Sequence, residues 1–286
     1  MTVLLPAESW RAGERLSLIG ALAGVLLAGF FATAIASSWL APFDPTAIGT
    51  GMPFESPSWR HFFGTDNFGR DVFSRVVAGT RPALVTGLAA TGLAVAIGAT
   101  LGLWLACRRG LVDEVVARVL DILISMPPLI MALLAISVFG SNPTLVVLTV
   151  AFLFAPRVAR VVRAAALSVV TEDYVTAALL RGETTISIAF RELLPNVAGT
   201  VFVEFSIRTG YAIVMIGSLS FLGFGSPPPT PEWGLMINEG YAAVNASFWP
   251  VLAPAAAMAL LVIAVNLFTE DFARLIGHSS AAGGRR

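Results

Sequence analysis

Residues 171–196 read TEDYVTAALLRGETTISIAFRELLPN, a polar interruption in a chain that is otherwise mostly apolar. Its second half carries apolar side chains at the spacing of an amphipathic helix, namely Ile186, Ala189, Phe190, Leu193 and Leu194. Pro195 is expected to end that helix, and Gly182 allows a turn from a shorter apolar stripe upstream. The stretch therefore predicts two short amphipathic helices that either cover the underside of a helix bundle or bind another protein.

The composition places the chain in a lipid bilayer. Its 286 residues are 56% hydrophobic and 13% charged, and its mean hydropathy of +0.81 is far above that of soluble domains. The 18 basic residues are all arginine and are balanced by 18 acidic ones, so the net charge gives no indication of nucleic-acid binding. Cys107 is the single cysteine, which excludes an intrachain disulfide and indicates a packing role.

Six apolar stretches are long enough to span a hydrocarbon core about 30 Å thick. They lie near Leu16–Leu40, Pro82–Ala106, Ala117–Phe139, Thr144–Val162, Val197–Phe221 and Trp249–Phe268. Because lipid offers no partner for an open sheet edge, the pattern predicts an all-α membrane protein with six transmembrane helices. The first stretch is longer than the core of a signal peptide, so we expect an uncleaved anchor.

The arginines predict the orientation of this bundle, since short arginine-rich loops remain in the cytoplasm. Most of them fall on one side: Arg11, Arg15, Arg108, Arg109, Arg118, Arg157, Arg160, Arg163, Arg181, Arg191, Arg285 and Arg286. The turn 140–143 and the loop 226–247 contain no arginine. Both termini are therefore expected to be cytoplasmic, with residues 41–80 and 226–247 outside.

The external segment 41–80 contains a charged pattern of its own. Asp66 is expected to cap a short helix, with ion pairs Asp66–Arg70 and Asp71–Arg75 at i,i+4 spacing. These four residues form either a charged cap on the bundle or a docking surface for an external partner. We expect no metal site, because His61 has no second histidine or cysteine nearby to complete a ligand set.

Three stretches in order resemble a known family. The spacing of Thr176-Ala177-Ala178, Gly182 and Leu194-Pro195 resembles the EAA loop of permease subunits in bacterial ATP-binding-cassette (ABC) importers. HFFGTDNFGRDVFSR (61–75) and SLSFLGFGSPPPTPEWG (218–234) resemble, more narrowly, the second permease of dipeptide, oligopeptide and nickel importers. One departure is Thr176, which stands where many relatives have a glutamate that pairs with the ATPase.

The resemblance implies a type I ABC importer permease fold in the bacterial inner membrane. It implies an anchor and external segment at 1–80, a core permease domain at 81–275 with a coupling segment at 171–196, and a tail at 276–286. The implied partners are a second homologous permease, two cytoplasmic ATP-binding subunits that carry ATP and Mg²⁺, and an external substrate-binding protein. The implied ATPase-coupling residues are Asp173, Tyr174, Thr176, Ala177, Ala178, Arg181, Gly182, Glu183, Leu194 and Pro195.

The lysine-free sequence supports a non-catalytic transport subunit with no cofactor of its own. A phosphate-binding loop of the GxxxxGK[ST] type needs lysine, so ATP hydrolysis must come from other subunits. A secondary transporter driven by an ion gradient is the alternative, with Glu204 or Asp121 as a proton site. An intramembrane enzyme would need a catalytic set at depth, yet His61 and His278 both lie outside the predicted spans. Peptides, nickel chelates and glutathione-like solutes all fit the resemblance.

Two further features lie in the predicted spans. Glu204 and Arg208 stand four residues apart in the fifth span, where charges are costly, and either neutralise each other or line the solute path. Asp121 is expected to pair with Arg118. The step Met126-Pro127-Pro128 predicts a bend in the third span, because proline removes a helix donor and clashes with the preceding turn.

Overall fold

A computed structural model describes residues 17–108 and 110–283, with side chains as far as Phe272. Within this part, regular structure is helical apart from one isolated β-bridge between Thr65 and Asp71. The elements are α1 (Leu18–Leu40), α2 (Val72–Cys107), α3 (Leu111–Ser125), α4 (Pro128–Phe139), α5 (Pro143–Val169), α6 (Asp173–Leu180), α7 (Thr185–Ser187), the π-helix η1 (Ile188–Leu193), α8 (Leu194–Phe221), α9 (Trp233–Tyr241) and α10 (Trp249–Gly283). The predicted all-α class is confirmed.

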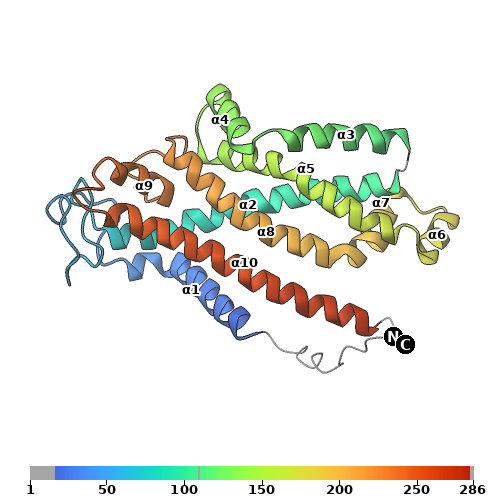
Figure 1. Ribbon diagram of the computed structural model, residues 1–286, viewed down its shortest axis with the longest axis horizontal. Helices are drawn as coiled ribbons and strands as arrows, with labels where there is room; N and C mark the ends of the chain where they lie inside the picture. Colours follow the sequence, from blue (N-terminus) through green and yellow to red (C-terminus); the bar gives the residue numbers. More distant parts are fainter. Residues whose placement is uncertain (1–16, 109, 284–286) are drawn as a thin grey trace, which may run out of the picture.

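The long helices α2, α5, α8 and α10 run side by side along the length of the molecule, and α1 lies against α2 and α10 (Figure 1). The short helices α6 and α9 lie at opposite ends of this bundle (Figure 1), which we call the α6 end and the α9 end. Five helical segments in the described residues are long and apolar enough to cross a membrane, and α3 with α4 makes a sixth, bent span.

The most extensive helix contact, between α2 and α5, depends on two glycines of α2. A Cβ atom built on Gly98 would lie 2.5 Å from the carbonyl oxygen of Ala155, and one on Gly102 would lie 2.5 Å from that of Ala159. Small residues four apart let two helix backbones approach each other, and such close packing is one of the interactions that hold helices together in lipid. The two glycines, Gly98 and Gly102, therefore allow the backbones of α2 and α5 to pack in direct contact.

The second span begins earlier than the sequence indicated. Helix α2 starts at Val72 rather than near Pro82, and Asp71 is its N-cap, accepting hydrogen bonds from the backbone N–H of Ser74 (2.8 Å) and from the Ser74 hydroxyl (2.7 Å). The expected short helix capped by Asp66 is absent from the described segment 61–71. Asp66 instead closes a turn by accepting from the backbone N–H groups of Phe68 and Arg70.

The predicted bend in the third span is confirmed. Helices α3 and α4 meet at an angle of 89° across Met126 and Pro127. Arg157 of α5 reaches this break and donates to the carbonyl oxygen of Ile124 at 3.2 Å. The contact satisfies one of the carbonyl groups that the end of α3 leaves without a helical partner.

Several predicted features lie outside the described residues. These are Arg11, Arg15, Arg109, Arg285 and Arg286. The predicted tail, 276–286, is helical as far as Gly283, because α10 continues beyond the expected end of the core at 275. Likewise, α2 passes through the expected boundary at residue 80 without a break.

Candidate functional site

The polar interruption forms a helix and a tight turn at the α6 end. Helix α6 is followed by Gly182 with a φ of +81°, a backbone conformation that side-chain-bearing residues rarely adopt. The N–H of Glu183 donates to the carbonyl oxygen of Ala178 at 3.2 Å, which closes the turn. The expected turn at Gly182 is present.

A small polar network holds the residues after this turn. The Glu183 carboxylate accepts from Arg181 (2.7 Å) and from the Ser187 hydroxyl (2.9 Å). These hydrogen bonds, that of Arg181 foremost, lower the pKa of Glu183 from its usual value. Glu183 is therefore charged at neutral pH and links the turn to the start of the next helix.

The second predicted amphipathic helix is not a separate element, and the expected stop at Pro195 is wrong. Helix α7 passes through η1 into α8, so the segment from Thr185 to Phe221 is continuous. In η1 the N–H of Leu194 donates to the carbonyl oxygen of Ala189, five residues back. The wider π-turn accommodates Pro195, which lies in the first turn of α8, where its missing N–H is tolerated.

The π-turn also changes which side chains of this segment are buried. In the predicted stripe, Ala189 and Leu193 are buried, but Ile186 and Phe190 are exposed. Ile188, which lay outside the stripe, is buried in their place. A π-turn contains an extra residue compared with an α-turn, so it rotates the register of the helix, and a period of 3.6 residues cannot anticipate this.

Helix α6 packs on the bundle through one face. Val175 and Ala178 are buried in a cluster with Leu193 of η1 and Leu103 of α2. The remaining predicted coupling residues are half-buried or exposed: Asp173, Tyr174, Thr176, Ala177, Arg181, Gly182, Glu183, Leu194 and Pro195. Ala178, one of the implied coupling residues, has its side chain fully covered by this chain's own residues.

The outer side of α6 is apolar. Leu180 is 85% exposed, and Tyr174 and Leu179 are also exposed. Monomeric soluble surfaces seldom cluster such residues, and a group of them marks an interaction site. We call Tyr174, Thr176, Ala177, Leu179 and Leu180 the outer face of α6.

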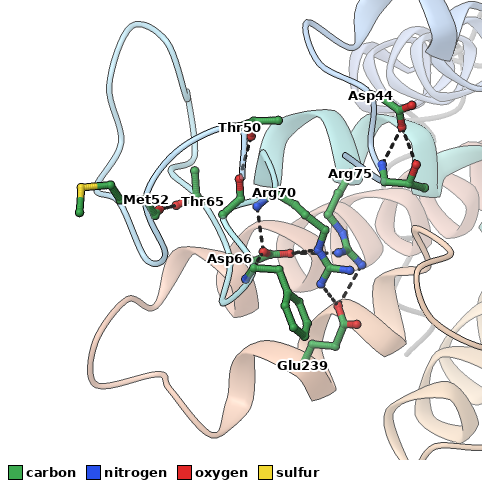
Figure 2. Close-up of polar contacts among 11 residues, drawn as sticks. Asp44, Thr50, Met52, Thr65, Asp66, Arg70, Arg75 and Glu239 are labelled. Atoms are coloured by element: carbon green, nitrogen blue, oxygen red, sulfur yellow. Dashed lines mark hydrogen bonds and ion pairs between the residues drawn. The ribbon is translucent and has the colours of Figure 1, made fainter. Parts of the chain in front are cut away.

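At the α9 end, buried charges fasten the segment 41–71 to α9 (Figure 2). Arg70 and Arg75 both donate to Asp66, at 2.6 and 3.0 Å, and both donate to Glu239 of α9, at 2.7 and 2.9 Å. The Asp66–Arg70 pair was expected, but Asp71 does not pair with Arg75. Asp71 instead accepts a contact of 2.9 Å from His61 Nδ1 while it caps α2.

The four residues expected to form either a charged cap or a docking surface are all buried. Asp66, Arg70, Asp71 and Arg75 have almost no accessible surface. Burying charges is favourable only when they are paired and hydrogen-bonded, as they are here. Their side chains therefore stabilise the shape of the segment, as the charged-cap alternative expects. Glu239 was not predicted as their partner, because it lies more than 160 positions away in the chain.

Glu204 and Arg208 form the expected ion pair within α8. Arg208 Nε and Nη2 both lie 2.9 Å from Glu204 Oε2. Glu204 is buried, and the Arg208 side chain is 15% exposed with its guanidinium 5.9 Å from the ring centre of Tyr211. Asp121, by contrast, pairs with Arg160 of α5 (3.0 Å), because Arg118 turns to Glu114 (2.7 Å).

The third motif, 218–234, is a structural joint between α8 and α9. The Trp233 side chain is buried, and its indole N–H donates to the carbonyl oxygen of Val76 at 3.0 Å. Glu232 accepts hydrogen bonds from the Ser220 hydroxyl and from the backbone N–H of Ser226. These contacts fix the loop after α8 and position α9, which carries Glu239.

The described part of the chain is a bundle of candidate membrane-spanning helices with an exposed apolar helix at one end. Residues 98–278 match the model of the binding-protein-dependent transport system inner membrane component family. The chain belongs to this family and is a permease subunit of a bacterial ABC importer in the inner membrane.

The chain is similar over most of its length to proteins that are named as transport system permeases. The chain is 35% identical over 93% of its length to a protein of Brucella suis biovar 1 named for a peptide transport system permease, 86% of which is covered. It is 34% identical over 92% of its length to the glutathione transport system permease protein GsiD of Pectobacterium atrosepticum, with 87% of that protein covered. GsiD of Escherichia coli O6:K15:H31 is 35% identical over 92% of the chain, and 87% of that protein is covered.

Proposed function

We propose that the outer face of α6 docks on a cytoplasmic ATPase subunit and that this contact couples ATP hydrolysis to transport. The observation that carries the proposal is the exposed apolar surface of α6 at one end of the bundle, on a helix whose opposite face is packed on the membrane-spanning helices. A helix held in this way can transmit a displacement to the bundle. Both termini would lie on the same, cytoplasmic side.

The complete importer would contain a second homologous permease, two ATP-binding subunits carrying ATP and Mg²⁺, and an external substrate-binding protein. This chain would bind no cofactor and catalyse no reaction. Its solutes would be peptides or similar small polar molecules, a class supported by the names of relatives assigned to peptide and glutathione transport. The external protein would contact exposed residues at the α9 end.

Two neighbouring alanines provide a matched test of docking. Ala177 is exposed and Ala178 is fully buried. We expect Ala177→Arg to reduce the amount of ATPase that co-purifies per permease, while the thermal midpoint of the permease is unchanged. Ala178→Arg would bury an unpaired charge and lower the midpoint, at a cost of about 3 kcal/mol or more. Full ATPase recovery and normal ATP-driven uptake by Ala177→Arg would contradict the proposal.

Thr176→Glu is a complementary variant, because it introduces the residue that many relatives carry. Thr176 is exposed, and its hydroxyl lies 3.5 Å from the carbonyl oxygen of Glu172. We expect the glutamate to be tolerated without loss of stability, and to tighten docking if the partner offers an arginine. Inhibition by vanadate identifies ATP as the energy source, whereas uptake that survives vanadate and collapses with a protonophore would identify a secondary transporter.

A further inference from the structure

An apolar groove of about 660 Å³ lies between the last turns of α2 and the segment formed by α7 and η1, near the α6 end of the bundle (Figure 1). Its walls include Ile97, Thr100, Leu101 and Trp104 of α2, Ile186 of α7 and Phe190 of η1. Ile97, Ile186 and Phe190 are all exposed, so the groove is open to the surroundings of the chain. Such a surface is unfavourable in water and suits an apolar occupant.

The length of the groove matches one leaflet of the bilayer. Its lining on α2 runs from Ala96 to Trp104, which is about 12 Å at the rise of an α-helix, and half of the hydrocarbon core is about 15 Å. Trp104 lies three positions before the end of α2 at Cys107, and tryptophans near the end of a span mark the interface of membrane and water. A helix of a second permease would cross both leaflets, whereas a lipid tail occupies one. The dimensions therefore favour a lipid tail.

A positive charge stands at the interfacial end of the groove. The guanidinium carbon of Arg108 lies 5.9 Å from the ring centre of Trp104, and the Arg108 side chain is exposed. The acids that follow it in the chain have other partners, because Asp113 pairs with Arg163 and Glu114 pairs with Arg118. Among the side chains that the structure describes, no carboxylate forms an ion pair with Arg108.

An apolar groove that ends at an unpaired arginine has the two parts that a phospholipid requires. The planar guanidinium matches two oxygens of a phosphate group, so Arg108 can bind the headgroup while the tail lies against Ile97, Leu101 and Phe190. A zwitterionic headgroup carries its own ammonium group, which offsets the phosphate. A basic residue at the membrane surface therefore favours lipids with a net negative charge.

We infer that the groove between α2 and the α7–η1 segment binds an anionic phospholipid, with one tail in the groove and the phosphate at Arg108. The inference goes beyond the proposed function and does not depend on it. The lipid fills the space beside η1 and covers the apolar side chains of Ile186 and Phe190, which the chain itself leaves exposed. It is thus a bound component of the joint between α2 and the residues that follow the turn at Gly182.

The test replaces Ile97, at the rim of the groove, by photoreactive benzoylphenylalanine in the complete importer, in nanodiscs of equimolar dioleoylphosphatidylglycerol and dioleoylphosphatidylcholine. On illumination the ketone attacks nearby C–H bonds, including those of lipid tails, and mass spectrometry identifies the adducts. We expect phosphatidylglycerol adducts to exceed phosphatidylcholine adducts about five-fold, which corresponds to about 1 kcal/mol. The control position, Leu260, is exposed in α10 away from the groove and should give the equal bulk ratio. Equal ratios at both positions, or capture of a protein chain instead of lipid at position 97, would overturn the inference.

Three variants, each combined with the photoreactive residue at position 97, separate the headgroup contact from the groove. Arg108→Gln should bring the ratio of adducts to about one, whereas Arg118→Gln, which removes the same charge from the Glu114 pair, should leave it unchanged. Thr100→Phe fills the groove and should abolish the enrichment although Arg108 is retained. Equal losses in Arg108→Gln and Arg118→Gln would show a general effect of net charge, and enrichment that persists in Thr100→Phe would show that the groove takes no part. Either result would contradict the assigned site.

Discussion

The Glu204–Arg208 pair shows how a buried charge pair can be tested without confusing stability with function. Each single apolar replacement leaves its partner unpaired, at a cost of about 3–5 kcal/mol. We expect the double variant Glu204→Met with Arg208→Met to assemble normally, because both charges are removed together, but to transport poorly if the pair lines the solute path. Solute uptake per assembled importer is the measurement, and uptake equal to that of the unmodified importer would end the path-lining proposal.

A single added methyl group should disturb the contact between α2 and α5. The new Cβ of Gly98→Ala would lie 2.5 Å from the Ala155 carbonyl oxygen, so the helices must separate, at a cost of about 1–3 kcal/mol. Gly92→Ala in the same helix is the control, because its Cβ would meet no atom within 4 Å. Thermal unfolding in detergent should show a lower midpoint for Gly98→Ala alone, and equal midpoints for the two variants would contradict this account of the interface.

At the scale of an element, the start of α2 depends on one carboxylate. Asp71→Ala removes the N-cap and leaves the buried His61 without its 2.9 Å partner. Loss of a cap costs about 1 kcal/mol, and an unsatisfied buried group adds about 1–3 kcal/mol. We expect a clearly lower thermal midpoint than for Asp44→Ala, a change in an exposed turn. Faster proteolysis within residues 41–71 of the Asp71→Ala variant would report the same loosening.

Local patterns predicted the elements that depend on composition. Long apolar runs located the spans, and the paired prolines at 127 and 128 located the break between α3 and α4. The burial of Ala178 and the π-turn at 188–193 were not predicted, because both depend on how α6 and η1 pack against α2. Glu239 was missed for the same reason, since only the folded chain brings it to Arg70 and Arg75.

At the scale of the whole molecule, the arginine distribution predicts the direction in which the bundle crosses the membrane. Reporters fused after Gly51 and Pro229, near the α9 end, should lie outside, and reporters fused after Thr184 and Arg286 should lie inside. The pair at Gly51 and Thr184 is decisive, because these positions flank opposite ends of the bundle. Alkaline phosphatase and green fluorescent protein fusions provide the measurement, and a cytoplasmic signal at Gly51 would reverse the assignment.

The uninterrupted helix from Thr185 to Phe221 has a mechanical consequence. Its 37 residues extend about 55 Å, more than the thickness of the hydrocarbon core, and its first residues lie directly after the turn at Gly182. A continuous helix of this length is stiff, so a force applied at one of its ends tilts the whole helix. A tilt of a few degrees at the α6 end displaces the far tip, where α9 is attached, by several ångströms. If α6 docks on an ATPase as proposed, a nucleotide-driven displacement of α6 would move the far end of α8 without any relay of side-chain rearrangements.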